Sequence, residues 1–559
     1  MKTFKELVYE RPDFEQEKDA LKRYAEDIKN ASSYEELRNV FLDREEASRH
    51  FDTMFNVAYI RNSIDTRDEF YDAEMTNFYK RQGSLTLLEQ EAEAALLKSP
   101  YLEDLKREFG ELLVQEIEIG QKLASPEVVD DMALDSALCQ EYNRVISACS
   151  TEFDGKACNF SGLLKHMQSV NRKERQEAFR AWADMYEGVS GELDRIYDQM
   201  VEVRSRIAGK LGFDSFISFV YARMGRFDYT PEDVKNFRRQ VKEYIVPLCQ
   251  RLFEEQAERL GVEELQWYDE QLTDPDGNAV PAGGREEMLG WGREMYQELA
   301  PEAGEFFDFM LEHELFDLET RLGKQPGGYC AFLKEEKAPF IFSNFNGTSA
   351  DVDVLTHEAG HAFEAYTSSR IYPLSAMVWS SSEINEIHSM SMEFFTYPWM
   401  EKFFGDKAER YRMRHLAQAL EAVPYMVCVD ELQHRVFEEG LNAEGRRRVW
   451  RELEQTYMPW RSYDGNVFLE NGGFWMQKLH IFVNPFYYVD YALAQMGAFE
   501  FYKKMTKNKE QAWADYYKLC KSGGSRGYFE TLAYAGLSNP FRDGTLKEIA
   551  DFLETKLFS

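Results

Sequence analysis

Residues 352–366 read VDVLTHEAGHAFEAY, and the middle of this segment carries the most specific chemical pattern in the chain. His357, Glu358 and His361 form an HExxH motif. On an α-helix, residues four positions apart lie one turn apart on the same face. Both imidazoles can therefore reach one metal ion, while Glu358 points at a water bound to that ion. The motif predicts a metal site, provided that the segment is helical.

The residues around the motif meet this helix requirement. Thr348 or Ser349 can cap the N-terminus of a helix. The residues that follow supply an apolar face at three- and four-residue spacing, made by Val354, Leu355, Ala359, Ala362, Phe363 and Tyr366. We expect one helix to carry both histidines.

A third ligand is expected on a second helix, which starts within residues 380–383 and is interrupted by Pro398. Glu386 and His388 are the candidates on this helix. They lie about 200° apart around an axis that turns about 100° per residue, so they cannot both face the ion. We choose Glu386 as the ligand.

A carboxylate that accepts a hydrogen bond from a ligand histidine usually completes such a site. Glu393 lies two turns beyond Glu386 on the same helix face, and we predict this role for it. Asp353, one turn before His357, is the alternative.

The chain as a whole is predicted to be mostly α-helical, because it has only 16 prolines in 559 residues and long segments have amphipathic periodicity. Residues 101–123 show this pattern clearly. Two short aromatic runs, residues 329–333 and 339–345, predict instead the strands of a hairpin or small sheet. We place a domain boundary near residue 195, where the half that carries the chemistry begins.

Charge and targeting signals exclude several classes of partner. With 99 acidic and 66 basic residues, the formal net charge is -33, so nucleic acid and anionic membrane surfaces are unfavourable partners. The first residues lack the apolar region of a secretory signal, and no window has the apolar length of a membrane span. We expect a cytoplasmic protein whose seven scattered cysteines are reduced thiols.

The HExxH segment, together with residues 383–395 (EINEIHSMSMEFF), resembles the M3 family of zinc oligopeptidases, in particular its oligoendopeptidase F and Pz-peptidase branch. Residues 523–530, GGSRGYFE, resemble the C-terminal Gly-Gly-Ser segment of that family. The resemblance covers residues 200–559 well.

This resemblance implies a mostly α fold, a helical ellipsoid with a deep substrate channel. One Zn²⁺ per chain would lie at the channel floor, with His357, His361 and Glu386 as its ligands. A small β-sheet would lie near the zinc-binding helix. Residues 1–195 would form one wall of the channel, and residues 196–559 would be the catalytic zinc peptidase region.

The strands expected at 329–333 and 339–345 would be that sheet. An edge strand there can pair with an extended peptide through main-chain hydrogen bonds. A purely structural hairpin is the alternative.

A histidine and two tyrosines of the family face the zinc and donate hydrogen bonds to the substrate carbonyl. By position, the matching residues are most like His480, Tyr488 and Tyr491, with Tyr487 as the alternative to Tyr488. Without the resemblance, packing in an aromatic core would explain the cluster equally well.

The resemblance thus implies a zinc-dependent oligoendopeptidase that hydrolyses internal bonds of short unstructured peptides, through a metal-activated water with Glu358 as general base. Two alternatives stay open: a zinc exopeptidase of the dipeptidyl carboxypeptidase type, and a metal-free helical scaffold that binds peptides. The same ligands also allow Co²⁺ or Mn²⁺. The sequence indicates no oligomeric state.

Overall fold

The computed structural model describes residues 1–558, and the chain forms two compact units. The first unit is built from residues 1–124, 280–409 and 497–538. The second is built from residues 125–279, 410–496 and the described residues from 539 onwards. The predicted boundary near residue 195 falls inside the continuous helix α8 (Arg172–Lys210), so the two units do not divide the chain there.

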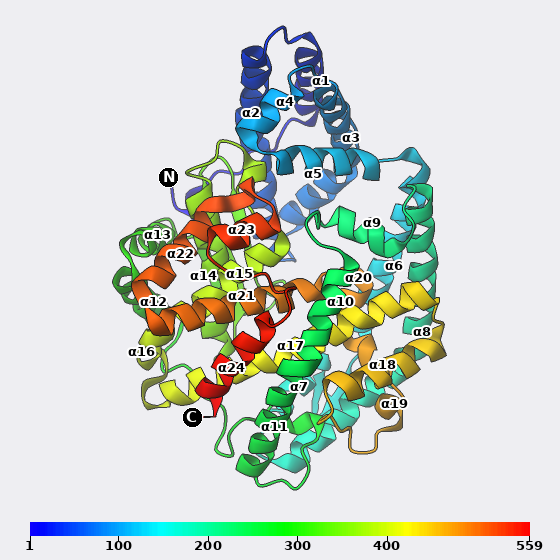
Figure 1. Cartoon of the computed structure of the whole chain (residues 1–559), viewed down its shortest axis with the longest axis vertical. Helices are drawn as coiled ribbons and strands as arrows, with labels where there is room; N and C mark the ends of the chain where they lie inside the picture. Colours follow the sequence, from blue (N-terminus) through cyan, green and yellow to red (C-terminus); the bar gives the residue numbers. More distant parts are fainter. Residues whose placement is uncertain (559) are drawn as a thin grey trace. The chain divides into compact units, whose positions relative to one another are not determined.

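The first unit is mainly helical, as predicted (Figure 1). It also contains one small sheet. Its helices are α1 (Phe14–Asn30), α2 (Tyr34–Ile64), α3 (Glu69–Leu97), α4 (Leu102–Phe109), α5 (Glu111–Leu123), α12 (Arg285–Leu299), α13 (Pro301–Glu312), α14 (Ala350–Ser368), α15 (Ser382–Phe395), α16 (Met400–Phe404), α22 (Lys509–Ser522) and α23 (Tyr528–Tyr534).

The second unit is also mainly helical and contains a two-stranded hairpin, β1 (Thr151–Phe153) and β2 (Lys156–Cys158). Two further helices, α17 (Ala408–Glu439) and α21 (Tyr488–Lys507), have residues in both units. The remaining helices are α6 (Val129–Ala148), α7 (Phe160–His166), α8, α9 (Phe216–Arg223), α10 (Pro231–Gln240), α11 (Val246–Leu260), α18 (Ala443–Tyr457), α19 (Val467–Glu470), α20 (Leu479–Val483) and α24 (Thr545–Leu557). Among residues 1–558, no helix combines the length and the apolar character that a bilayer span requires.

Helices α1, α2 and α3 pack against one another, and each begins at a side chain that accepts hydrogen bonds from the first turn. The capping residues are Asp13, Ser33 and Asp68. Residues 101–123 do not form one helix, because Gly110 adopts a φ of 95° between α4 and α5. Such a positive φ is accessible to glycine at little cost, so the chain turns there without losing its amphipathic pattern.

The small sheet of the first unit contains both predicted strands and one that the sequence did not reveal. The predicted strands are β4 (Tyr329–Leu333) and β5 (Ala338–Phe345), which pair antiparallel. The unpredicted strand β3 (Phe316–Glu319) pairs parallel to β5, so the strand order is β3-β5-β4. Helix α14 packs against β4 and β5, which places the sheet beside the HExxH helix as predicted.

The N-terminus of α14 is stabilised differently from the prediction. Ser349 is the N-cap residue, but its side chain accepts no capping hydrogen bond, and Thr348 Oγ1 instead donates to Asn346 Oδ1 at 2.8 Å. The carboxylate of Asp351 accepts hydrogen bonds from the main-chain N–H groups of Asn346 at 2.9 Å and Gly347 at 2.8 Å. A carboxylate in the first helical turn also interacts favourably with the helix dipole.

Helices α14 and α15 approach each other most closely at Gly360, inside the HExxH motif. A Cβ atom added at this position would lie 2.6 Å from both the carbonyl oxygen of His388 and the Cα of Ser389. Both are backbone atoms of α15, so they cannot move away as a flexible side chain would. Only glycine allows this helix separation.

Replacing Gly360 with alanine should therefore destabilise the first unit by about 1–3 kcal/mol, the usual cost of overpacking a core. The unfolding midpoint in urea, followed by circular dichroism, measures this effect. Gly191→Ala on α8 is the matched control, because its Cβ would meet nothing within 4 Å. The control should gain up to about 1 kcal/mol from helix propensity. Equal midpoints for the two variants would contradict the close approach.

Candidate metal centre and active site

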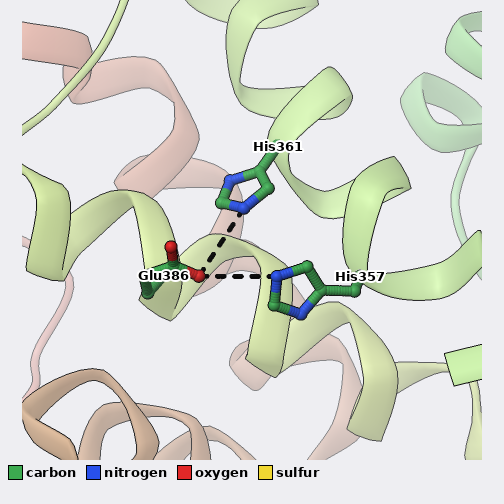
Figure 2. Close-up of side chains that lie close together, drawn as sticks. All are labelled: His357, His361 and Glu386. Carbon is green, nitrogen blue, oxygen red and sulfur yellow. Dashed lines mark ion pairs between the residues drawn. The ribbon is translucent and has the colours of Figure 1, made fainter. Parts of the chain in front are cut away.

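Three side chains with metal-binding atoms meet in the first unit, and all three were predicted as ligands. His357 and His361 come from α14 and Glu386 comes from α15 (Figure 2). Glu386 Oε2 lies 3.4 Å from His357 Nε2 and 3.6 Å from His361 Nε2. The three ligand atoms lie within 4.8 Å of one another. No other group of His, Cys, Asp or Glu in the described chain meets this criterion.

These distances can be compared with the geometry that zinc requires. Zn–N and Zn–O bonds of about 2.0–2.2 Å in a tetrahedral site place neighbouring ligand atoms about 3.3–3.6 Å apart. The two imidazole–carboxylate distances, 3.4 and 3.6 Å, agree with this range. Two histidines and one glutamate also leave the fourth position open, as in catalytic zinc sites. The residues therefore fit Zn²⁺.

Glu393 fixes the orientation of the first histidine. Its Oε1 lies 2.6 Å from Nδ1 of His357, a hydrogen bond in which the imidazole N–H donates. With Nδ1 held by Glu393, Nε2 is the nitrogen that faces Glu386, and a metal ion that replaces the proton on Nε2 can bind there. The predicted role of Glu393 is present in the structure, and the alternative partner, Asp353, is not needed for it.

The candidate ligand residues shift the pKa values of one another. Burial alone would lower the pKa of His357, but the carboxylates of Glu386 and Glu393 raise it well above its ordinary value. Burial alone would raise the pKa of Glu386, yet hydrogen bonds from His357 and His361 hold it well below its ordinary value. The site therefore keeps an ionised carboxylate in a buried place, where a cation is stabilised.

Glu358 lies next to the ligands. One of its carboxylate oxygens is open to solvent, and the other is enclosed by protein. The residue is 8% exposed, and burial raises its pKa. Its Oε2 is buried and has no hydrogen-bond partner among the described residues. Oε1 is not so enclosed, so it is the oxygen that can exchange a proton with a water molecule.

His388 does not face the metal ligands, in agreement with the helical phase argument. Its Nδ1 lies 3.0 Å from Oε2 of Glu364 on α14, and both side chains are fully buried. The main-chain oxygen of His388 also accepts a hydrogen bond from Tyr516 at 2.9 Å, and Glu364 Oε1 accepts from the main-chain N–H of Ser380 at 3.1 Å. This pair joins α14 and α15 on the side opposite Glu386.

Sequence reasoning did not find the partnership between Glu364 and His388. The only available signal was that two ionisable residues occupied apolar helix faces. Charged groups in such positions are rarely buried unless they are paired. Which groups pair depends on the packing of α14 against α15, and periodicity within each helix does not reveal it.

The predicted carbonyl-binding residues gather in the second unit. The ring centroid of His480 lies 4.7 Å from that of Tyr488 and 6.2 Å from those of Tyr491 and Tyr487. Tyr491 also contacts Tyr487 and Tyr488, at 5.2 and 5.7 Å between centroids. The four rings form one cluster, and their role toward the metal ligands of the first unit stays a prediction.

Comparison with known sequences identifies related proteins. A family described as "Peptidase M3 N-terminal domain" matches residues 4–124, and "Peptidase family M3" matches residues 165–276 and 303–551. Oligoendopeptidase F from Lactococcus lactis subsp. cremoris is 23% identical over 406 residues, covering 70% of this chain and 63% of that protein. An oligoendopeptidase F homolog from Borreliella burgdorferi is 26% identical over 234 residues, covering 41% and 39%. The chain thus spans less than two thirds of the length of these curated relatives.

Comparison with solved structures gives a more complete match. A structure of Pz peptidase A with an inhibitor has 43% sequence identity and a TM-score of 0.93, and the match covers 99% of both chains. The likeness therefore extends over nearly the whole fold.

Replacing Glu393 with alanine should weaken zinc binding about 10- to 100-fold, the usual effect of removing the carboxylate behind a ligand histidine. Zinc affinity is measured by competition with a chromogenic chelator. Glu393→Gln, which keeps an acceptor oxygen for the N–H of His357, should lose less affinity than Glu393→Ala. Unchanged affinity in the alanine variant would show that Glu393 does not orient the ligand.

The Glu364–His388 pair should make stability depend on pH. Burial alone would lower the pKa of His388, but Glu364 and the neighbouring Cys520 together raise it to about 10, whereas the unfolded value is about 6.5. The folded state therefore holds a proton that the unfolded chain releases. The contribution is complete below about pH 6.5 and is lost as the pH rises toward about 10.

Between pH 7 and pH 9, the free energy of unfolding of the native protein should therefore fall as the pH rises. This slope should be steeper than the slope of His388→Asn by up to about 1.4 kcal/mol per pH unit. Urea unfolding of the metal-free proteins at several pH values measures both slopes. Parallel slopes would contradict a charged His388.

Proposed function

Because the chain belongs to peptidase family M3, we propose that it is a zinc-dependent oligoendopeptidase that hydrolyses internal bonds of short, unstructured peptides. The convergence of His357, His361 and Glu386 beside Glu358 is the observation that carries this proposal. The likeness to Pz peptidase A and to oligoendopeptidase F supports the same reaction class.

In the proposed reaction, Glu358 transfers protons while the other residues hold the reacting groups. Zn²⁺, held by His357, His361 and Glu386, would polarise the scissile carbonyl and lower the pKa of a water molecule towards about 7. Glu358 Oε1 accepts a proton as the water oxygen forms a bond to the carbonyl carbon. The same carboxyl group then returns the proton to the amide nitrogen as the C–N bond breaks.

His480, Tyr488 and Tyr491 are the proposed donors to the carbonyl oxygen, where negative charge develops. Their mutual ring contacts hold the side chains in one cluster, and such a cluster can present its donors without further reorganisation. Tyr487 contacts the same rings and stays the alternative to Tyr488.

The substrate is proposed to bind along the sheet of the first unit. Strand β4 lies at the edge of the order β3-β5-β4 and packs near the HExxH helix. An extended peptide that adds to this edge is held by its main chain, so affinity does not require one particular sequence. This binding mode favours unstructured peptides over folded proteins. The cytoplasmic location of the reaction stays a prediction.

A mixed pool of short peptides, analysed by mass spectrometry, tests the proposal. The native protein should release fragments cut at internal bonds, and chelation should stop the cleavage. Glu358→Gln should keep its metal and lose about 10²–10⁴-fold in rate, because an amide cannot accept the proton. Normal cleavage by this variant would show that Glu358 is not the base.

Two controls separate the alternatives. His361→Ala should lose both metal and activity and keep its helical circular dichroism signal; a variant that keeps its metal would contradict the ligand set. Peptides with blocked termini should still be cleaved, whereas an exopeptidase would not cleave them. Purified protein without metal or cleavage would favour the peptide-binding scaffold.

A further inference from the structure

A glycine with no conformational reason to be glycine lies directly against the open oxygen of Glu358. A Cβ atom added at Gly328 would lie 3.5 Å from Glu358 Oε1, 3.5 Å from Val354 Cγ1 and 3.4 Å from the carbonyl oxygen of Phe342. The missing side chain of Gly328 therefore leaves a methyl-sized space in front of this carboxylate.

The two usual reasons for glycine do not apply at this position. Its neighbour Gly327 needs glycine because its φ is 99°, but Gly328 is outside the positive-φ region. Gly360 needs glycine because backbone atoms lie 2.6 Å from its Cβ position, but the distances at Gly328 are ordinary van der Waals contacts. Alanine is therefore compatible with the backbone and the packing at residue 328.

The space matters because it borders the only open oxygen of Glu358. Oε2 is enclosed by protein, so water and substrate must reach the carboxylate from the side of Oε1. Gly328 also directly precedes β4, the edge strand along which a peptide main chain is proposed to lie. One residue thus borders both the proton acceptor and the start of this edge.

We propose that Gly328 is a positioning residue whose absent side chain admits the peptide main chain and the attacking water to Oε1 of Glu358. This inference rests on the proposed function and adds a steric determinant to it. A methyl group at residue 328 would cover Oε1 and displace the peptide main chain from the edge of β4. Displacements of about 1 Å in a reacting pair can cost about 10²-fold in rate.

Gly328→Ala tests the proposal in the zinc-loaded, full-length protein. We expect kcat/KM for an internally quenched peptide to fall about 10- to 100-fold, with kcat reduced as well as KM raised. Zinc content and the melting temperature should stay at native values, because the three atoms nearest to the new methyl group belong to Phe342, Glu358 and Val354 and not to the ligands.

Gly284→Ala is the matched control, because its Cβ would also meet a glutamate oxygen, Glu287 Oε2 at 3.4 Å. This variant should keep native kinetics.

A second measurement does not depend on turnover. The dissociation constant of the same peptide is compared between Glu358→Gln and Glu358→Gln/Gly328→Ala. The double variant should bind the peptide at least about tenfold more weakly if the methyl group occupies the path of the main chain.

The outcomes separate this inference from the proposed function. Native kcat/KM in Gly328→Ala, or an equal loss in Gly284→Ala, would overturn the role of Gly328. A loss of activity that accompanies lost zinc or a lowered melting temperature would overturn it too, since the cause would be structural. If the native protein cleaves no peptide, or if Glu358→Gln stays fully active, the proposed function fails instead.

Discussion

The close approach of α14 and α15 is the constraint on which the candidate site depends. Glu386 reaches both imidazoles only because the backbone of α15 lies against Gly360, where even a Cβ atom would be 2.6 Å from His388 O. The resulting ligand distances of 3.4 and 3.6 Å agree with tetrahedral zinc. A wider helix separation would leave two histidines on one face without a third ligand. The glycine inside HExxH is therefore part of the candidate metal site, although it has no side chain.

Two acidic side chains then hold the two helices in one orientation. Glu393 fixes the ring of His357, and Glu364 pairs with His388 on the opposite side of α15. Compared with well-packed apolar residues of similar size, ion pairs of this kind add little net stability, because desolvation opposes the attraction. Removing one partner is nevertheless costly, since it leaves a buried charge uncompensated. Their effect is to exclude other rotations of α15, and this keeps Glu386 directed at the imidazoles.

The sheet beside α14 is the proposed link between this centre and the substrate. Strand β5 is central and its residues are almost all buried, whereas β4 lies at an edge and starts directly after Gly328. Glu358, the proposed proton acceptor, and the edge proposed to hold the peptide therefore meet at one glycine. Membership of peptidase family M3 is consistent with this arrangement, from which we expect a small residue at position 328 to matter for chemistry rather than for folding.

Much of the site was readable from sequence, because helical periodicity fixes the direction of each side chain relative to its own helix. This placed His357 and His361 on one face, excluded His388 as a partner of Glu386 at the ion, and assigned Glu393 to a ligand histidine. The motifs also indicated the family, and the aromatic runs indicated β4 and β5. Contacts between elements could not be predicted from the sequence. They include the pairing of β3 with β5, the Glu364–His388 pair, the hydrogen bonds of Asp351 at the start of α14 and the space at Gly328. Each of these depends on the distance and rotation between segments far apart in the chain, which only the packed structure determines.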